Sequence, residues 1–150
     1  MKRVYLRLAA CAASLILALM WLTGCDDGGN SGGGTNNVTN APVSLAGKDV
    51  THTITTGTPP FPSSGTFVLH VGGAPGVTTG SYTITGSGAA TNSSGTYTYV
   101  MTSGNTASLV LQDSVFGQVN ESMTFQTPAA GTFSSSTGSG GTEGGSFITD

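Results

Sequence analysis

The sequence predicts an all-β domain, built as an antiparallel meander of about eight strands. Three observations predict it: apolar residues alternate with Thr or Ser over short runs, glycines separate those runs, and long runs of helix-forming residues are lacking. The chain has 150 residues, which suits one domain with one hydrophobic core.

A short unit of Gly, then Thr or Ser, then an aromatic residue recurs along the chain. The unit begins at Gly65, Gly80, Gly95, Gly131 and Gly145. Each unit opens a run in which every second residue is apolar, and this is the period of a strand with one buried face. The units therefore mark five of the predicted strands.

The remaining strands come from alternation alone. Residues 50–54 form the first strand, and the wide gap between the third and fourth units leaves room for strands at residues 107–111 and 122–125. The residues expected to face inward are Val50, Ile54, Phe67, Leu69, Val71, Tyr82, Ile84, Tyr97, Tyr99, Met101, Ala107, Leu109, Leu111, Met123 and Phe125.

The connections between the predicted strands are too short for parallel crossovers. About four residues separate two strands at residues 102–105 and near residues 128–130, and about eight residues do so elsewhere. Consecutive strands should therefore pair as antiparallel hairpins. A meander of this length leaves two open edges unless it closes, which favours a small up-and-down barrel, with a two-sheet β-sandwich as the alternative.

The first 24 residues read as an export signal. Lys2, Arg3 and Arg7 give a basic start, and residues 8–22 are almost wholly apolar but short for crossing a bilayer. The stretch Leu22-Thr23-Gly24-Cys25 then places a branched apolar residue three positions before a cysteine and a small residue directly before it.

This stretch resembles the lipobox of bacterial lipoproteins. The resemblance implies that residues 1–24 are removed, that the Cys25 thiol carries a diacylglyceryl group, and that the new amino group is acylated. Two or three acyl chains hold a soluble domain firmly on a membrane, because each buried methylene contributes about 0.8 kcal/mol. The expected location is the cell envelope, facing the periplasm or the exterior. A transmembrane anchor, or a cleaved signal with an incidental cysteine, is the alternative.

Residues 25–41 follow as a tether rich in Gly, Asn and Ser, with a single Val38. Such a composition buries too little apolar surface to offset chain ordering, so a flexible linker is expected. The β domain should then occupy residues 42–150. In strand count and meander it loosely resembles the calycin-like small barrels, although the Gly-x-Trp of true lipocalins is absent from it.

The charge distribution excludes nucleic acid as a partner. Only Lys48 follows Cys25, whereas all seven carboxylates do. A surface with one cation and so many anions repels phosphate backbones.

The sequence offers no catalytic, metal or cofactor motif. His52 should point inward and His70 outward, so the two cannot share a metal ion. Asp49, Asp113, Glu121, Glu143 and Asp150 occur singly, mostly near predicted strand ends, and are expected to be solvated loop charges. Asp113 and Glu121 flank one loop, where they could meet as an acid and base pair or a calcium pair.

A binding hypothesis remains. Tyr97, Tyr99 and Met101 would line the inside of a barrel, and the Pro59-Pro60-Phe61-Pro62 loop would hold Phe61 at its tip. Together they suggest a cavity for a small apolar ligand at the barrel mouth, with core filling and a rigid turn as the alternative interpretation. The predicted function is a non-catalytic, lipid-anchored module that binds a small ligand or an envelope protein.

Two alternatives differ in class. A structural or adhesive surface module would have open edge strands. An envelope hydrolase would gather Asp113, Glu121 and His70 in one cleft.

Overall fold

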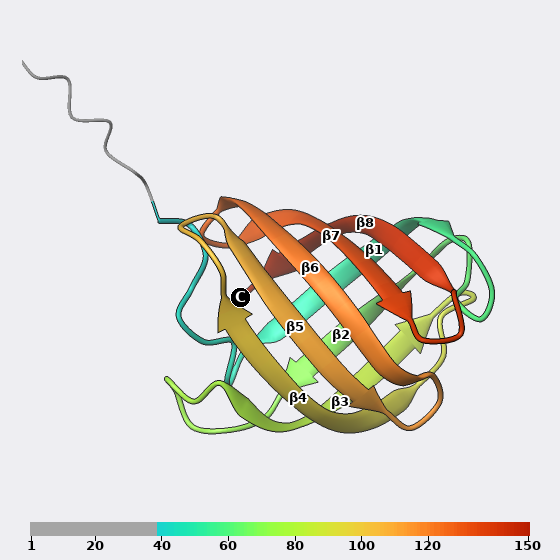
Figure 1. The fold of residues 1–150 in the computed structure, drawn as a ribbon, viewed down its shortest axis with the longest axis horizontal. Coiled ribbons are helices and arrows are strands. Elements are labelled where there is room, and N and C mark those ends of the chain that lie inside the picture. The colour runs from blue at the N-terminus through green and yellow to red at the C-terminus, as the bar shows by residue number, and fades with distance from the viewer. Residues whose placement is uncertain (1–38) are drawn as a thin grey trace, which may run out of the picture. The chain divides into compact units, whose positions relative to one another are not determined.

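The computed structural model describes residues 39–150, and the predicted signal peptide, the lipobox Leu22-Thr23-Gly24-Cys25 and the tether as far as residue 38 lie outside the described residues. Eight antiparallel strands form a closed barrel in chain order, and β1 pairs with β8 (Figure 1). The strands are β1 (Asp49–Gly57), β2 (Gly65–Val71), β3 (Thr79–Ser87), β4 (Ser93–Met101), β5 (Thr106–Asp113), β6 (Gly117–Thr127), β7 (Ala130–Thr137) and β8 (Thr142–Thr149).

The predicted all-β meander is thus confirmed, and closure selects the up-and-down barrel over the two-sheet sandwich. Every strand pairs with its neighbours along the chain, as the short connections require. Across residues 39–150 there is no helix long and apolar enough to cross a membrane.

The period-two alternation places the core inside the barrel. Burial alternates along most strands, most regularly in β6 and β7. The side chains predicted to face inward are buried, apart from the half-buried Ile84 and from Met101. Met101 was expected inside with Tyr97 and Tyr99 but is 38 % exposed, because it is the last residue of β4.

The glycines of the recurring unit have a packing role inside the barrel. In β3 and β4, Gly80 lies opposite Tyr97 and Tyr82 lies opposite Gly95. The same exchange occurs in β7 and β8, where Gly131 faces Phe147 and Phe133 faces Gly145. An inward glycine leaves the space that the ring on the neighbouring strand fills.

The N-terminal residues of the described chain close one end of the barrel. Ala41 and Leu45 are buried in the core, and the Asn40 and Ala41 amides donate to the Gly104 carbonyl. Residues 40 and 41 therefore belong to the folded domain, although the sequence placed them in the tether. The C-terminus and the β2–β3 and β4–β5 loops lie at this same end, whereas the β1–β2 and β7–β8 loops lie at the other (Figure 1).

Substitution of Gly131 by Ala should destabilise the barrel by about 1–3 kcal/mol. A Cβ there would lie 2.0 Å from the Thr124 carbonyl oxygen and 2.8 Å from the Phe147 ring, so strand or ring must move. Gly138→Ala is the matched control, since no atom lies within 4 Å of its added Cβ. Urea unfolding of both variants measures the difference, and equal midpoints would contradict the packing role of Gly131.

Candidate functional site

The end of the barrel opposite the N-terminal segment carries two aromatic side chains on neighbouring loops. Phe61 lies in the β1–β2 loop and Phe116 in the β5–β6 loop, with ring centroids 5.0 Å apart. Phe61 is buried and Phe116 is half-buried. The Phe61 loop is held at its base, where the Thr58 amide donates to the Thr142 carbonyl (2.7 Å). These two rings cap the interior of the barrel.

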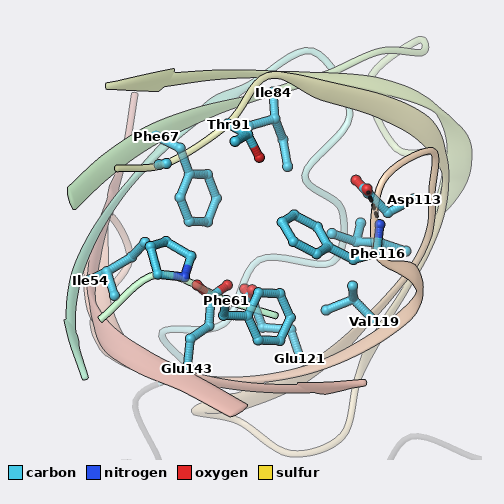
Figure 2. Close-up of a pocket in the computed structure, with 13 residues that line it drawn as sticks. Ile54, Phe61, Phe67, Ile84, Thr91, Asp113, Phe116, Val119, Glu121 and Glu143 are labelled. Carbon is cyan, nitrogen blue, oxygen red and sulfur yellow. Dashed lines mark hydrogen bonds between the residues drawn. The ribbon is translucent and has the colours of Figure 1, made fainter. Parts of the chain in front are cut away.

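Beneath the cap lies a cavity of about 30 Å³, room for roughly one or two water molecules. Its wall is apolar on most sides and carboxylate-bearing on one, and Glu121 and Glu143 point into it from the same side in Figure 2. The residues that line it are Ile54, Phe61, Pro62, Phe67, Ile84, Ala90, Thr91, Leu111, Asp113, Phe116, Val119, Glu121 and Glu143.

A shallow groove of about 380 Å³ lies outside the same cap. Pro59, Pro60 and Val115 contribute to it, and Phe61 and Phe116 line both the groove and the cavity. Pro62 and Thr91 also line both spaces. The groove and cavity thus form the outer and inner parts of one site.

Asp113 fixes the loop that carries Phe116. One carboxylate oxygen accepts the backbone amides of Val115 (2.8 Å) and Phe116 (3.0 Å). The other accepts the hydroxyls of Tyr82 (2.6 Å) and Ser93 (2.7 Å). Burial raises the pKa of Asp113, but these hydrogen bonds outweigh it, so the net shift is downward. Both oxygens of Asp113 are therefore used in hydrogen bonds that hold the Phe116 loop in place.

Glu121 is held by a second buried network. Its carboxylate contacts His52 Nε2 (3.1 Å) and accepts the Ser135 hydroxyl (3.0 Å). His52 Nδ1 lies 3.3 Å from the Val50 carbonyl oxygen. The imidazole stacks on Phe67 with ring centroids 4.4 Å apart. Both Glu121 oxygens are therefore used within the barrel wall.

Glu143 differs from the other two acids of the cavity. Its side chain is 8 % exposed, yet no group in residues 39–150 donates a hydrogen bond to its carboxylate. Burial, together with the charge of Glu121, raises the pKa of Glu143 to about 7, against a smaller opposing effect from His52. A buried acid whose pKa is raised into the neutral range, at the wall of a cavity, is typical of a functional site.

The residues predicted as ligand-binding do not gather in one place. Phe61 lies at the mouth, as expected, whereas Tyr97 and Tyr99 fill the core toward the opposite end. Their hydroxyls donate to the carbonyls of Gly72 (3.0 Å) and Pro42 (2.8 Å), and burial raises the pKa of Tyr99 to about 12. Tyr97 and Tyr99 thus serve as core residues, and Met101 lies on the surface.

The expectation that the carboxylates are solvated is wrong for three of them. Asp113, Glu121 and Glu143 are buried, and all three line the cavity. Asp113 and Glu121 do not pair with each other, because each has its own partners. His52 points inward as predicted. His70 lies on the partly exposed outer wall, where it bonds Asp49 (2.8 Å), and so does not join the acids.

No set of three or more His, Cys, Asp or Glu side chains suited to a metal ion occurs within residues 39–150. Comparison with protein-family models, with curated proteins and with solved structures gave no match. The barrel architecture that the calycin resemblance implied is present, and the family itself stays a prediction.

Replacement of Glu143 by Gln should stabilise the protein at high pH and not at low pH. A raised pKa means that folding binds the proton more tightly, so the free energy of unfolding of the native protein falls as pH rises from about 4.5 to about 7. The amide cannot ionise and escapes this loss, which is about 3 kcal/mol at pH 8.

Chemical unfolding of both proteins at pH 4 and pH 8 measures the effect. The two curves should coincide in acid and separate at pH 8, with the variant more stable. A gap independent of pH would show that Glu143 does not titrate in this range.

Proposed function

We propose that this protein is a lipid-anchored bacterial envelope lipoprotein whose barrel binds a small molecule without catalysing a reaction. The anchor rests on the sequence, in the basic start, the apolar run and the lipobox that ends at Cys25. The binding role rests on the site between Phe61 and Phe116. These two parts are independent and are tested separately.

The observation that carries the binding role is the groove of about 380 Å³ that adjoins, at Phe61 and Phe116, the small cavity with Glu143 at its wall. Small-molecule sites are concave and mainly apolar, with a few polar groups that orient the ligand. The cavity has an apolar wall, and the hydrogen bonds described above leave only one of its three acids without a donor. The cap of two aromatic rings gives this site an entrance that side-chain rotation can widen.

The order of contacts in the buried network favours binding over hydrolysis. A catalytic triad needs the histidine between the nucleophile and the acid, so that it can remove the hydroxyl proton. Here Glu121 lies between His52 and Ser135. Ser135 therefore donates to a carboxylate and not to the imidazole. His70, which the hydrolase alternative requires in the cleft, lies on the outer wall.

Barrel closure argues against the adhesive alternative. That role needs an open strand edge that can pair with another chain. In the described part of the chain, each of the eight strands is hydrogen-bonded on both sides. Residues 39–150 therefore offer no open strand edge to which another chain could add a strand.

The position of residues 40–45 suggests how the site is presented. The N-terminal segment enters at the barrel end opposite Phe61 and Phe116, where Asn40 donates to the Gln126 carbonyl (3.1 Å). The predicted flexible tether that leads to Cys25 would therefore join the barrel at the end away from the entrance of the cavity, so that the tether leaves this entrance uncovered.

Replacement of Cys25 by Ala should abolish incorporation of labelled palmitate and leave the precursor uncut, because the thiol is the site of acylation. Metabolic labelling followed by electrophoresis measures both effects. Cys11→Ala is the matched control, since Cys11 lies within the predicted signal, and its labelling should be unchanged. Continued labelling of the Cys25 variant would refute the anchor.

Benzyl alcohol should bind with its ring in the groove beside Phe61 and Phe116 and its hydroxyl toward the cavity, because the cavity of about 30 Å³ is too small for the ring. Titration of the full chain in detergent micelles, followed by methyl NMR, should shift the resonances of Ile54 and Ile84, which line the cavity. Ile148 is the internal control, because it is 60 % exposed and does not line the cavity. Phe61→Ala should widen the entrance and speed exchange of the ligand.

Equal shifts at all three isoleucines would indicate general solvent or micelle effects. Such a result, or no shift at Ile54 and Ile84, would contradict the binding role.

A further inference from the structure

Among the three acids that line the cavity, Glu143 is the one whose carboxylate accepts no hydrogen bond from residues 39–150. It is more than nine-tenths buried, and it receives no hydrogen bond from the described chain. Its oxygens are reached by the solvent of the cavity, because every fully enclosed side-chain nitrogen or oxygen of residues 39–150 has a hydrogen-bond partner. A ligand that displaces this solvent would have to supply a donor in its place.

The remaining charges of the site restrict the kind of donor. Glu121 and Asp113 also line the cavity, and neither Lys nor Arg does. An anionic ligand would be repelled by these carboxylates, whereas a cationic one would be attracted. The negative charge of the cavity wall therefore favours a positively charged group next to Glu143.

The chemistry of the wall favours an organic cation over a metal ion. Calcium needs six to eight oxygen ligands, and the oxygens of Asp113 and Glu121 are already committed to protein donors. The rest of the wall is aromatic and aliphatic, which suits an ammonium group on a hydrocarbon body. The Phe61 and Phe116 rings, with centroids 5.0 Å apart, border both the cavity and the groove through which such a group would pass.

The dimensions match a ligand with a small head and a larger body. The cavity of about 30 Å³ accepts a group of the size of an ammonium ion, and the outer groove of about 380 Å³ accepts a ring or short alkyl chain. Phe61, Pro62, Thr91 and Phe116 border both spaces. The head and the body of one molecule can thus occupy the two parts together.

We propose that the site is selective for small primary amines, with the ammonium group paired to Glu143 and the apolar body in the groove beside Phe61 and Phe116. This inference rests on the proposed ligand-binding function and names its ligand class. Binding needs the ionised carboxylate, so affinity should rise with pH between 6 and 8. His52 on β1, Glu121 on β6 and Asp113 on β5 are the other titratable groups at or near Glu143.

The test compares benzylamine with benzyl alcohol, which has the same ring and no charge. Each is titrated into the full chain in detergent micelles at pH 8, with the Ile54 and Ile84 methyl signals as the readout and Ile148 as the internal control. Benzylamine should bind about tenfold more tightly, the difference expected for a charge-assisted hydrogen bond. Glu143→Gln should reduce benzylamine to the affinity of the alcohol.

Asp49→Asn is the matched control, because it removes the same charge from the opposite end of β1, where Asp49 is partly exposed. It should leave the affinity for benzylamine unchanged. Thermal unfolding checks that each variant is folded.

Each of the other possible outcomes refutes a specific part of the proposal. Equal affinity for the two compounds, or full affinity in Glu143→Gln, refutes amine selectivity and leaves a general small-molecule site. Displacement of benzylamine by millimolar calcium chloride, with the same loss in Glu143→Gln, shows an inorganic cation site instead. Absence of binding by both compounds refutes the proposed binding function itself.

Discussion

The exchange of glycine and aromatic residues between paired strands is the constraint on which this barrel depends. An eight-stranded barrel has an interior only wide enough to be filled by side chains, so two large rings cannot face each other across every pair. Gly80 and Gly95 admit the rings of Tyr97 and Tyr82, and Gly131 and Gly145 admit those of Phe147 and Phe133. The recurring unit of a glycine followed two residues later by an aromatic residue therefore reflects the packing of the barrel interior.

This arrangement also explains why the interior tolerates ionisable groups. The imidazole of His52 stacks on Phe67 and meets the edge of Phe133, so the rings that fill the barrel also hold the histidine. Once fixed, His52 and Ser135 occupy both oxygens of Glu121. A fully hydrogen-bonded buried network of this kind adds specificity to the packing. The charge of Glu121 in turn helps to raise the pKa of Glu143, whose carboxyl receives no hydrogen bond from residues 39–150.

Much of the fold could be predicted because strand periodicity and short connections leave few alternatives. The same periodicity also indicates that two of the acids are buried. Glu121 has the parity of Met123 and Phe125, and Glu143 has that of Phe147, so alternation placed both inside. The general preference of charged residues for solvent outweighed that signal, and the prediction of solvated carboxylates was therefore wrong.

The composition of the site could not be predicted in the same way. His52 in β1 and Glu121 in β6 are not on neighbouring strands, so their contact depends on closure and on the stagger of strands around the barrel. Sequence spacing does not report that stagger. No sequence pattern linked Phe116 to Phe61. Phe116 lies at the mouth beside Phe61 because its backbone amide donates a hydrogen bond to Asp113.

The two ends of the barrel differ for a physical reason that bears on access. At one end the chain itself is the plug, since Leu45 is fully buried and the Tyr99 hydroxyl is bonded to the Pro42 carbonyl. Opening that end would break backbone contacts and expose the core. At the other end, the Phe61 and Phe116 side chains lie between the cavity and the groove. Side-chain rotation is far easier than removal of a chain segment, so exchange with solvent must pass the aromatic cap.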